Sequence, residues 1–219
     1  MSEKNNTLPE ITPGDRHPDY KGEIAALLRG NLAPEGAVIK HSAVPKKMHH
    51  ALLRARPFDC EEDAIDAILK HRIQPGDAVF IRYEGPRGSG MPEMFYTTEA
   101  ISSDPELSAS IALITDGRFS GASKGPAIGH VSPEAAQGGP IALVEEGDLI
   151  LIDVKTRKLE IVGVAGEEKT PEEMDAILKE RKKAWKKRPS RYDSGVLSVY
   201  TRLAASPMKG GMTEPPSDD

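Results

Sequence analysis

The sequence contains a single cysteine, Cys60, among its 219 residues. The chain therefore forms no internal disulfide and cannot by itself supply the roughly three or four thiolates that usually anchor an iron–sulfur cluster. It also lacks an apolar run of about 18 residues, the length that a membrane span needs. Residues 1–16 are polar and contain no apolar signal core. We therefore expect a cytoplasmic protein that does not enter a membrane.

Aromatic residues and excess positive charge are also scarce. Aromatics make up 5% of the chain, and the formal net charge is -5. A nucleic-acid partner is not expected, because binding phosphates requires a dense basic face. The basic run at residues 179–191 is interpreted as a solvated helix face. Hydrophobic residues at 38% and charged residues at 29% are typical of a globular protein.

Composition and turn signals divide the chain into four segments. Residues 1–18 are expected to form an extended arm, residues 19–165 the main domain, residues 166–206 a helical extension and residues 207–219 a disordered tail. In the main domain, Asp19 is expected to begin a short helix that ends at Gly30, followed by a strand at 36–44.

The main domain alternates short apolar runs with capped helices. Asp59 and Glu62 have capping-box spacing and predict a helix that ends near His71. Apolar runs predict strands at 78–83 and 110–114, a brief helix at 134–137, and a meander at 140–144, 148–154 and 158–164. Thr170 and Glu173 open a strong helix that Pro189 closes, and residues 195–205 predict a last helix.

The loop at residues 116–125 has an unusual density of glycines, hydroxyls and charges directly after a strand. Glycines allow backbone N–H groups to approach an anionic ligand, and hydroxyls or cations can orient a carboxylate. A tight turn with a solvated rim is the simpler alternative. Walker-loop spacing is absent, and Arg118 stands where a nucleophile elbow around Ser120 would need glycine.

A second loop, at residues 82–94, follows another strand and contains Glu93 among apolar neighbours. A carboxylate in such surroundings needs compensation, which makes Glu93 a candidate ligand for Mg²⁺. An acid that interacts with a helix dipole is an equally good interpretation. His130 is interpreted as a hydrogen-bonded structural residue. Cys60 begins a helix, where its pKa could be lowered, although an incidental buried cysteine is the simpler interpretation.

These loops resemble the dihydroxy-acid dehydratase and 6-phosphogluconate dehydratase family. The resemblance rests on Thr-Asp-Gly-Arg-Phe-Ser-Gly at 115–121, on the run 128–136, on Gly-Gly-Pro-Ile at 138–141, on Gly-Asn-Leu-Ala-Pro at 30–34 and on Met-Pro-Glu-Met at 91–94. It covers roughly residues 25–165 and only the C-terminal part of that family.

The resemblance implies an α+β fold, a β-rich swivelling β/β/α domain with a barrel-like core and peripheral helices. Family members dehydrate 2,3-dihydroxy carboxylates to 2-oxo-3-deoxy acids with an iron–sulfur cluster and Mg²⁺, which are held largely by an N-terminal domain. It further implies Ser120 as the catalytic base, Ser123 and Gly121 as substrate-binding residues and Glu93 as a metal ligand. An N-terminal cluster-binding domain or subunit is the implied partner, and the complete enzyme is expected to be a homo-oligomer.

Some features depart from the usual pattern of dihydroxy-acid dehydratases. The loop at 85–90 is one residue shorter, and a charged extension follows residue 165. Together with the run 95–101, these features resemble the D-xylonate-type branch, which implies a sugar acid such as a pentonate as substrate. A non-catalytic binding module from a split or truncated dehydratase gene is the alternative function.

Overall fold

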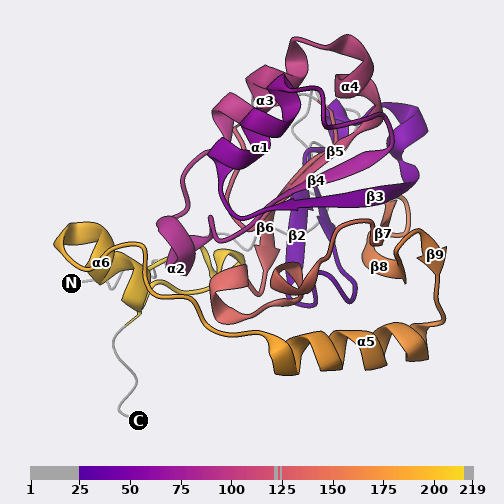
Figure 1. Cartoon of the computed structure of the whole chain (residues 1–219). Coiled ribbons are helices and arrows are strands. Elements are labelled where there is room, and N and C mark those ends of the chain that lie inside the picture. The colour runs from indigo at the N-terminus through magenta and orange to yellow at the C-terminus, as the bar shows by residue number, and fades with distance from the viewer. Residues whose placement is uncertain (1–24, 121–122, 124, 215–219) are drawn as a thin grey trace, which may run out of the picture.

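The computed structural model describes residues 25–120, 123 and 125–214 (Figure 1). Within these residues the strands form one nine-stranded sheet in the order β1-β2-β6-β5-β4-β3-β7-β8-β9. Its centre is parallel and consists of β3 (His50–Phe58), β4 (Asp77–Ile81), β5 (Ala112–Thr115) and β6 (Ala127–Ser132). The carboxyl ends of these four strands therefore lie at one edge of the sheet.

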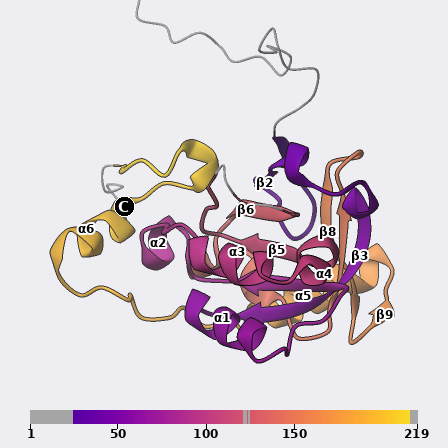
Figure 2. The same cartoon turned by 90° about the horizontal axis from the view of Figure 1, so that it is seen from above.

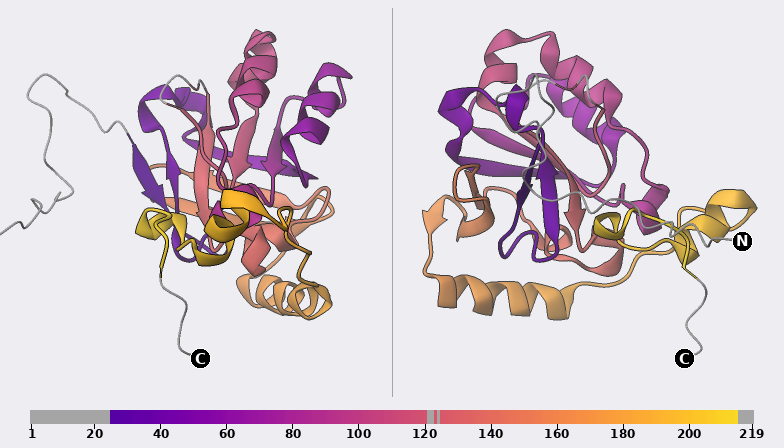
Figure 3. Two further views of the ribbon diagram at one scale, coloured as in Figure 1. Left: turned by 90° about the vertical axis from the view of Figure 1, so that its left-hand side faces the viewer. Right: turned by 180° about the vertical axis from the view of Figure 1, so that it is seen from behind.

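Antiparallel strands flank this centre and curl the sheet (Figures 2 and 3). They are β1 (Ala26–Leu28), β2 (Gly36–Ile39), β7 (Leu149–Asp153), β8 (Lys158–Val164) and β9 (Glu167–Glu168). Backbone hydrogen bonds of 2.9 Å join Arg29 to Arg157 and Leu159, which brings the end of β1 against β8. A side chain at Gly30 would meet the Leu159 carbonyl oxygen at 2.2 Å, so this contact requires glycine.

Two apolar cores form on the two faces of the curled sheet. Helices α1 (Glu61–Leu69), α3 (Phe95–Ser102) and α4 (Pro105–Ser110) cover one face, as Figure 1 shows. Between these helices and the sheet lies an apolar core, which includes the buried side chains of Ile68, Ile81, Ile101, Leu107 and Leu113. The concave face encloses a larger core, which includes Leu28, Ile39, Phe80, Ile128, Ile150 and Ile161. The expected α+β fold with a barrel-like core and peripheral helices is confirmed.

Helix α5 (Pro171–Ala184) lies along the sheet and begins with the expected capping box of Thr170 and Glu173. Near its end, Arg181 donates to the fully buried carboxylate of Asp148 at 2.6 and 3.0 Å. Arg181 also contacts Glu145 at 3.0 Å. These contacts attach the segment after residue 165 to the sheet. Helix α6 (Gly195–Leu203) packs against the short α2 (Pro86–Ser89).

The structure differs from the sequence prediction in several elements. The expected helix between Asp19 and Gly30 is wrong over its described part, because residues 26–28 pair with β2 as a strand; Asp19 itself lies outside the described residues. The expected strand at 140–144 is the 3-10 helix η4 (Pro140–Leu143). Asp59 does not cap α1; its carboxylate accepts hydrogen bonds from Arg82, at 2.7 Å from Nε, and Arg188.

Four further short helices in the described residues are of the 3-10 type. They are η1 (His41–Ala43), η2 (Lys46–Met48), η3 (Ala135–Gln137) and η5 (Pro207–Lys209). The last one, η5, falls in the expected disordered tail, and Met212 of that tail accepts a backbone hydrogen bond from Ala205 at 2.8 Å. The helices in the described part of the chain include none that is long and apolar enough to cross a membrane.

Candidate functional site

Both loops that the sequence analysis singled out begin at the same edge of the sheet. Residues 82–94 follow β4, and residues 116–120 follow β5, which is its parallel neighbour. A third loop, at residues 133–139, follows β6. Since the carboxyl ends of parallel strands meet at one edge, segments far apart in the sequence converge here, as at ligand sites of other open sheets.

Asp116 is the centre of this convergence. Its carboxylate is fully buried and accepts hydrogen bonds from the backbone N–H groups of Tyr83 at 3.2 Å, Glu84 at 2.9 Å and Ala135 at 2.8 Å. One side chain therefore ties the three loops together. Burial raises the pKa of Asp116 to about 6, because desolvation outweighs the stabilising backbone N–H groups.

Two further buried carboxylates shape the loop at 82–94. Glu134 accepts hydrogen bonds from the backbone N–H groups of Arg87 and Gly88, both at 2.9 Å. Desolvation raises its pKa to about 7. Glu84 accepts a hydrogen bond from the Ser89 hydroxyl and lies 3.1 Å from Arg191, and desolvation raises its pKa as well. Glu134 thus fixes the backbone of this loop, and Glu84 connects the loop to Arg191 through its side chain.

Ser120 and Ser123 lie beside one small cavity of about 90 Å³. Ser120 is half-buried and Ser123 is buried, and the Ser123 N–H donates to the Ser120 carbonyl at 3.3 Å. The other lining residues are Ala25, Val38, Lys40, Phe119, Ala127, Gly129 and His130. Ligand cavities usually measure about 300 to 1,000 Å³, so this one holds only part of a small substrate. Gly121 lies outside the described residues.

Glu93 is exposed, and its backbone runs beside that of Arg118, two positions before Ser120. The Met94 N–H donates to the Arg118 carbonyl at 2.9 Å, which ties the Glu93 segment to the serine loop. Neither Glu93 nor Ser120 is sealed in the core. Two positions 27 apart in the sequence are therefore joined through Arg118.

The acids, histidines and cysteine in the described residues include no group of three or more with an arrangement suited to a metal ion. Glu93 could supply one carboxylate to Mg²⁺, a cation that takes oxygen ligands and keeps several waters. An iron–sulfur cluster does not fit the thiols of this chain. Burial raises the pKa of Cys60 to about 11, and neighbouring Asp63 and Glu62 add to the rise. The possibility of a lowered Cys60 pKa is therefore wrong.

Three residues lie at this site although the sequence pattern assigned them no role there. His130 and Lys40 line the cavity beside Ser120, and Asp116 holds the loops from beneath. Desolvation, followed by the charge of Arg118, lowers the pKa of His130. Lys40 lies about 80 positions from Ser120 in a segment after β2, so no local motif could have revealed it. The position of Asp116 directly after an apolar strand was the available signal.

A comparison with known protein families shows to which family the chain belongs. Residues 11–211 match the family described as "Dihydroxy-acid/6-phosphogluconate dehydratase C-terminal". The chain belongs to this family. The match includes the segment after residue 165, so the charged extension is part of the family's own pattern rather than a departure from it.

Curated relatives of this chain are named dihydroxy-acid dehydratases. A dihydroxy-acid dehydratase of Agathobacter rectalis is 49% identical over 214 residues, which cover 97% of this chain and 36% of the relative. One from Thermodesulfovibrio yellowstonii is 50% identical over 89% of this chain and 34% of the relative. One from Moorella thermoacetica is 52% identical over 86% and 32%, respectively. The chain thus spans about a third of the length of these relatives.

Proposed function

We propose that this chain is the serine-bearing C-terminal part of a hydro-lyase that converts a 2,3-dihydroxy carboxylate to a 2-oxo acid. The observation that supports this most strongly is the convergence of the Ser120 loop and the Glu93 loop at one sheet edge, within a chain of the dehydratase family. The named relatives are dihydroxy-acid dehydratases, so we propose a dihydroxy acid as substrate. The expected pentonate branch gains no support from them.

Ser120 is proposed to remove the proton at C2 of the substrate. The electron pair of the C2–H bond then forms the C2–C3 double bond as the 3-hydroxyl leaves, and the resulting enol tautomerises to the 2-oxo acid with net release of water. A serine hydroxyl is too weakly acidic for this role unless nearby positive charge favours its alkoxide. Lys40 lines the same cavity, and Arg118 is two positions away, so both can contribute that charge.

Ser123 and Gly121 are proposed to hold the substrate, and Glu93 to reach Mg²⁺. Ser123 supports this proposal by lying at the same cavity as Ser120. When bound in the whole enzyme, an iron–sulfur cluster and Mg²⁺ supply Lewis acidity to the leaving hydroxyl and to the developing enolate. The residues that hold them are proposed to lie mainly in the other two thirds of the dehydratase.

Two features support such a partner. The cavity beside Ser120 is too small to enclose a substrate by itself. Phe95 and Tyr96, two and three positions after Glu93, are 45% and 69% exposed, which leaves an apolar ridge near the proposed metal ligand. A cluster-binding domain that packs on this edge would complete the cavity and cover the ridge.

The test compares Ser120→Ala with Ser123→Ala in the chain assembled with the remainder of the dehydratase. Ser120→Ala should lower kcat by about a thousandfold or more, because the group that takes the proton is lost. Ser123→Ala should mainly raise KM, by about tenfold, which corresponds to one lost hydrogen bond. Both variants should melt like the wild type. Normal turnover by Ser120→Ala would show that this serine is not the base.

A further inference from the structure

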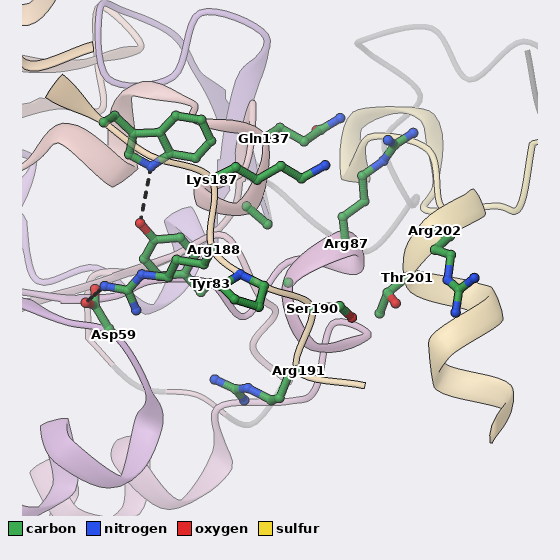
Figure 4. Close-up of a pocket in the computed structure, with 14 residues that line it drawn as sticks. Asp59, Tyr83, Arg87, Gln137, Lys187, Arg188, Ser190, Arg191, Thr201 and Arg202 are labelled. Carbon is green, nitrogen blue, oxygen red and sulfur yellow. Dashed lines mark hydrogen bonds and ion pairs between the residues drawn. The ribbon is translucent and has the colours of Figure 1, made fainter. Parts of the chain in front are cut away.

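A second cavity, of about 630 Å³, lies between the segment that follows α5 and the loops around α2 and η3 (Figure 4). Its volume is typical of sites for small molecules. The residues that line it are all different from those that line the cavity beside Ser120. A ligand here would therefore occupy a site separate from the cavity beside Ser120.

The charge of this cavity is opposite to that of the chain as a whole. The chain has 34 acids against 29 lysines and arginines. The described residues that line the cavity nevertheless include a single acid, Asp59, and five cations, Arg87, Lys187, Arg188, Arg191 and Arg202. Such a concentration of one sign attracts anions.

Three of the five cations form no salt bridge in the described part of the chain. Arg188 is paired with Asp59, and Arg191 lies 3.1 Å from Glu84. Arg87, Lys187 and Arg202, by contrast, form no salt bridge with any acid that the structure describes. Arg202 donates instead to the Ser198 hydroxyl at 2.5 Å. The Arg87 Nε donates to the Ala204 carbonyl at 2.7 Å, which fixes the side chain and leaves its two Nη groups for a ligand. The charge of Arg87 interacts with the buried Glu134 carboxylate and is partly balanced by it, whereas Lys187 has no salt-bridge partner among the described residues.

The side chains around these cations are held in place by aromatic contacts. Trp185 Nε1 lies 3.4 Å from the Tyr83 hydroxyl, and the Arg188 guanidinium stacks 4.1 Å from the centre of the Tyr83 ring. In Figure 4 the ends of Arg87, Lys187 and Gln137 point to the same side of the cavity. A guanidinium fork, an ammonium and an amide thus face one space.

We propose that this basic cavity binds a phosphate group, either as inorganic phosphate or as the phosphate of a small metabolite. Arg87 and Lys187 together offer positive charge to a phosphate dianion, and the Arg87 fork can bind two of its oxygens. Lys187 provides a point charge, and the Gln137 amide provides a neutral donor. A monocarboxylate carries less negative charge than a phosphate dianion and should bind these cations more weakly.

Intrinsic fluorescence can test this proposal, because Trp185 is the only tryptophan of the chain and lines the cavity. Inorganic phosphate, and in a second arm glycerol phosphate, is titrated into the chain at an ionic strength held constant with sodium chloride. Both should give a saturable change in Trp185 emission, and acetate should give none. Tighter binding of glycerol phosphate would identify a metabolite as the source, and equal binding would identify free phosphate.

Charge-removing variants locate the site. Lys187→Gln and Arg87→Gln should each weaken phosphate binding about tenfold, the cost of one charge-assisted hydrogen bond. Lys186→Gln removes the same charge next to the cavity without lining it and should bind phosphate like the wild type. If Arg87→Gln does not fold, the exposed Lys187 decides. The proposal is overturned if phosphate gives no saturable change, if acetate binds equally well, or if Lys187→Gln titrates like the wild type.

Discussion

Asp116 and Asp148 are both fully buried carboxylates, but they are stabilised in opposite ways. Asp116 accepts hydrogen bonds from the backbone N–H groups of three loop residues. Asp148 is held by the guanidinium of Arg181, with a closest contact of 2.6 Å. The first carboxylate binds neutral dipoles, and the second binds a full positive charge.

This difference corresponds to two tasks. Backbone N–H groups are fixed in space, so Asp116 imposes a shape on the loops near Ser120 and Glu93. Because the dipoles compensate burial only in part, the pKa of Asp116 rises to about 6. A guanidinium compensates a buried charge more fully, and the Arg181 contact attaches a helix that arrives from a distant part of the sequence. The free-energy cost of ionising Asp116 therefore lies next to the candidate site.

Replacement of Arg181 by Met should give the largest effect on stability. It leaves the buried Asp148 without its cation, which should lower the free energy of unfolding by about 3 kcal/mol. Urea unfolding measures the change. Lys179→Met is the control, because Lys179 is an exposed cation on the same helix. A loss below about 1 kcal/mol for Arg181→Met, or an equal loss for both variants, would contradict the role assigned to this ion pair.

The buried acids near the candidate site should make the stability of the chain depend on pH. The pKa values of Asp116 and Glu134 are raised to about 6 and about 7 from 3.8 and 4.5, so the folded state binds these protons more tightly than the unfolded state. Their stabilising contribution is present below about pH 4 and is lost as the pH rises through 6 and 7. Unfolding should therefore cost more free energy at pH 5 than at pH 8.

Glu134→Gln isolates the contribution of Glu134 to the pH dependence of stability. The variant and the wild type share His130 and the other histidines, so the effects of these residues cancel in the comparison. The variant should lose about 2 kcal/mol of the difference between pH 5 and pH 8, as measured by urea unfolding at each pH. The prediction is contradicted if wild type and Glu134→Gln show the same difference in unfolding free energy between pH 5 and pH 8. Such a result would show that backbone N–H groups compensate this carboxylate as well as a cation does.

Asp66 should give the smallest effect. It pairs with Lys70 at 2.8 Å and Arg72 at 2.6 Å, but all three side chains are exposed. Solvent screens such pairs, so Asp66→Asn should leave the urea midpoint unchanged within error. A clear shift of the urea midpoint would show that ion pairing stabilises the chain without burial, and that burial is not needed to explain the loss of stability expected for Arg181→Met.

Local patterns in the sequence predicted the elements whose signals are local. The capping box at Thr170, the helix after Gly195 and the strand at 158–164 are in place because their caps and apolar periods lie within a few residues. Strand β3 was missed: its residues alternate between exposed and buried, but Pro57 and the neighbouring polar loop weaken the signal. The 26–28 segment became a strand because its partner lies in β2.

The candidate site shows the same limit. The motifs at 91–94 and 115–121 indicated both loops, but their distance from each other depends on the parallel pairing of β4 and β5. Asp116 was interpreted as part of a loop, whereas three N–H donors from distant loops make it a buried anchor. The basic run at 179–191 was interpreted as a solvated helix face; in the structure it continues past α5 and lines the phosphate cavity.

The most direct test of the central claim combines this chain with the separately produced remainder of a dihydroxy-acid dehydratase, under anaerobic conditions. We predict that the remainder takes up an iron–sulfur cluster, that this chain alone takes up none because Cys60 is its sole thiol, and that 2-oxo acid forms from a 2,3-dihydroxy acid after the two are mixed. A stable cluster spectrum and turnover with this chain alone would contradict the account.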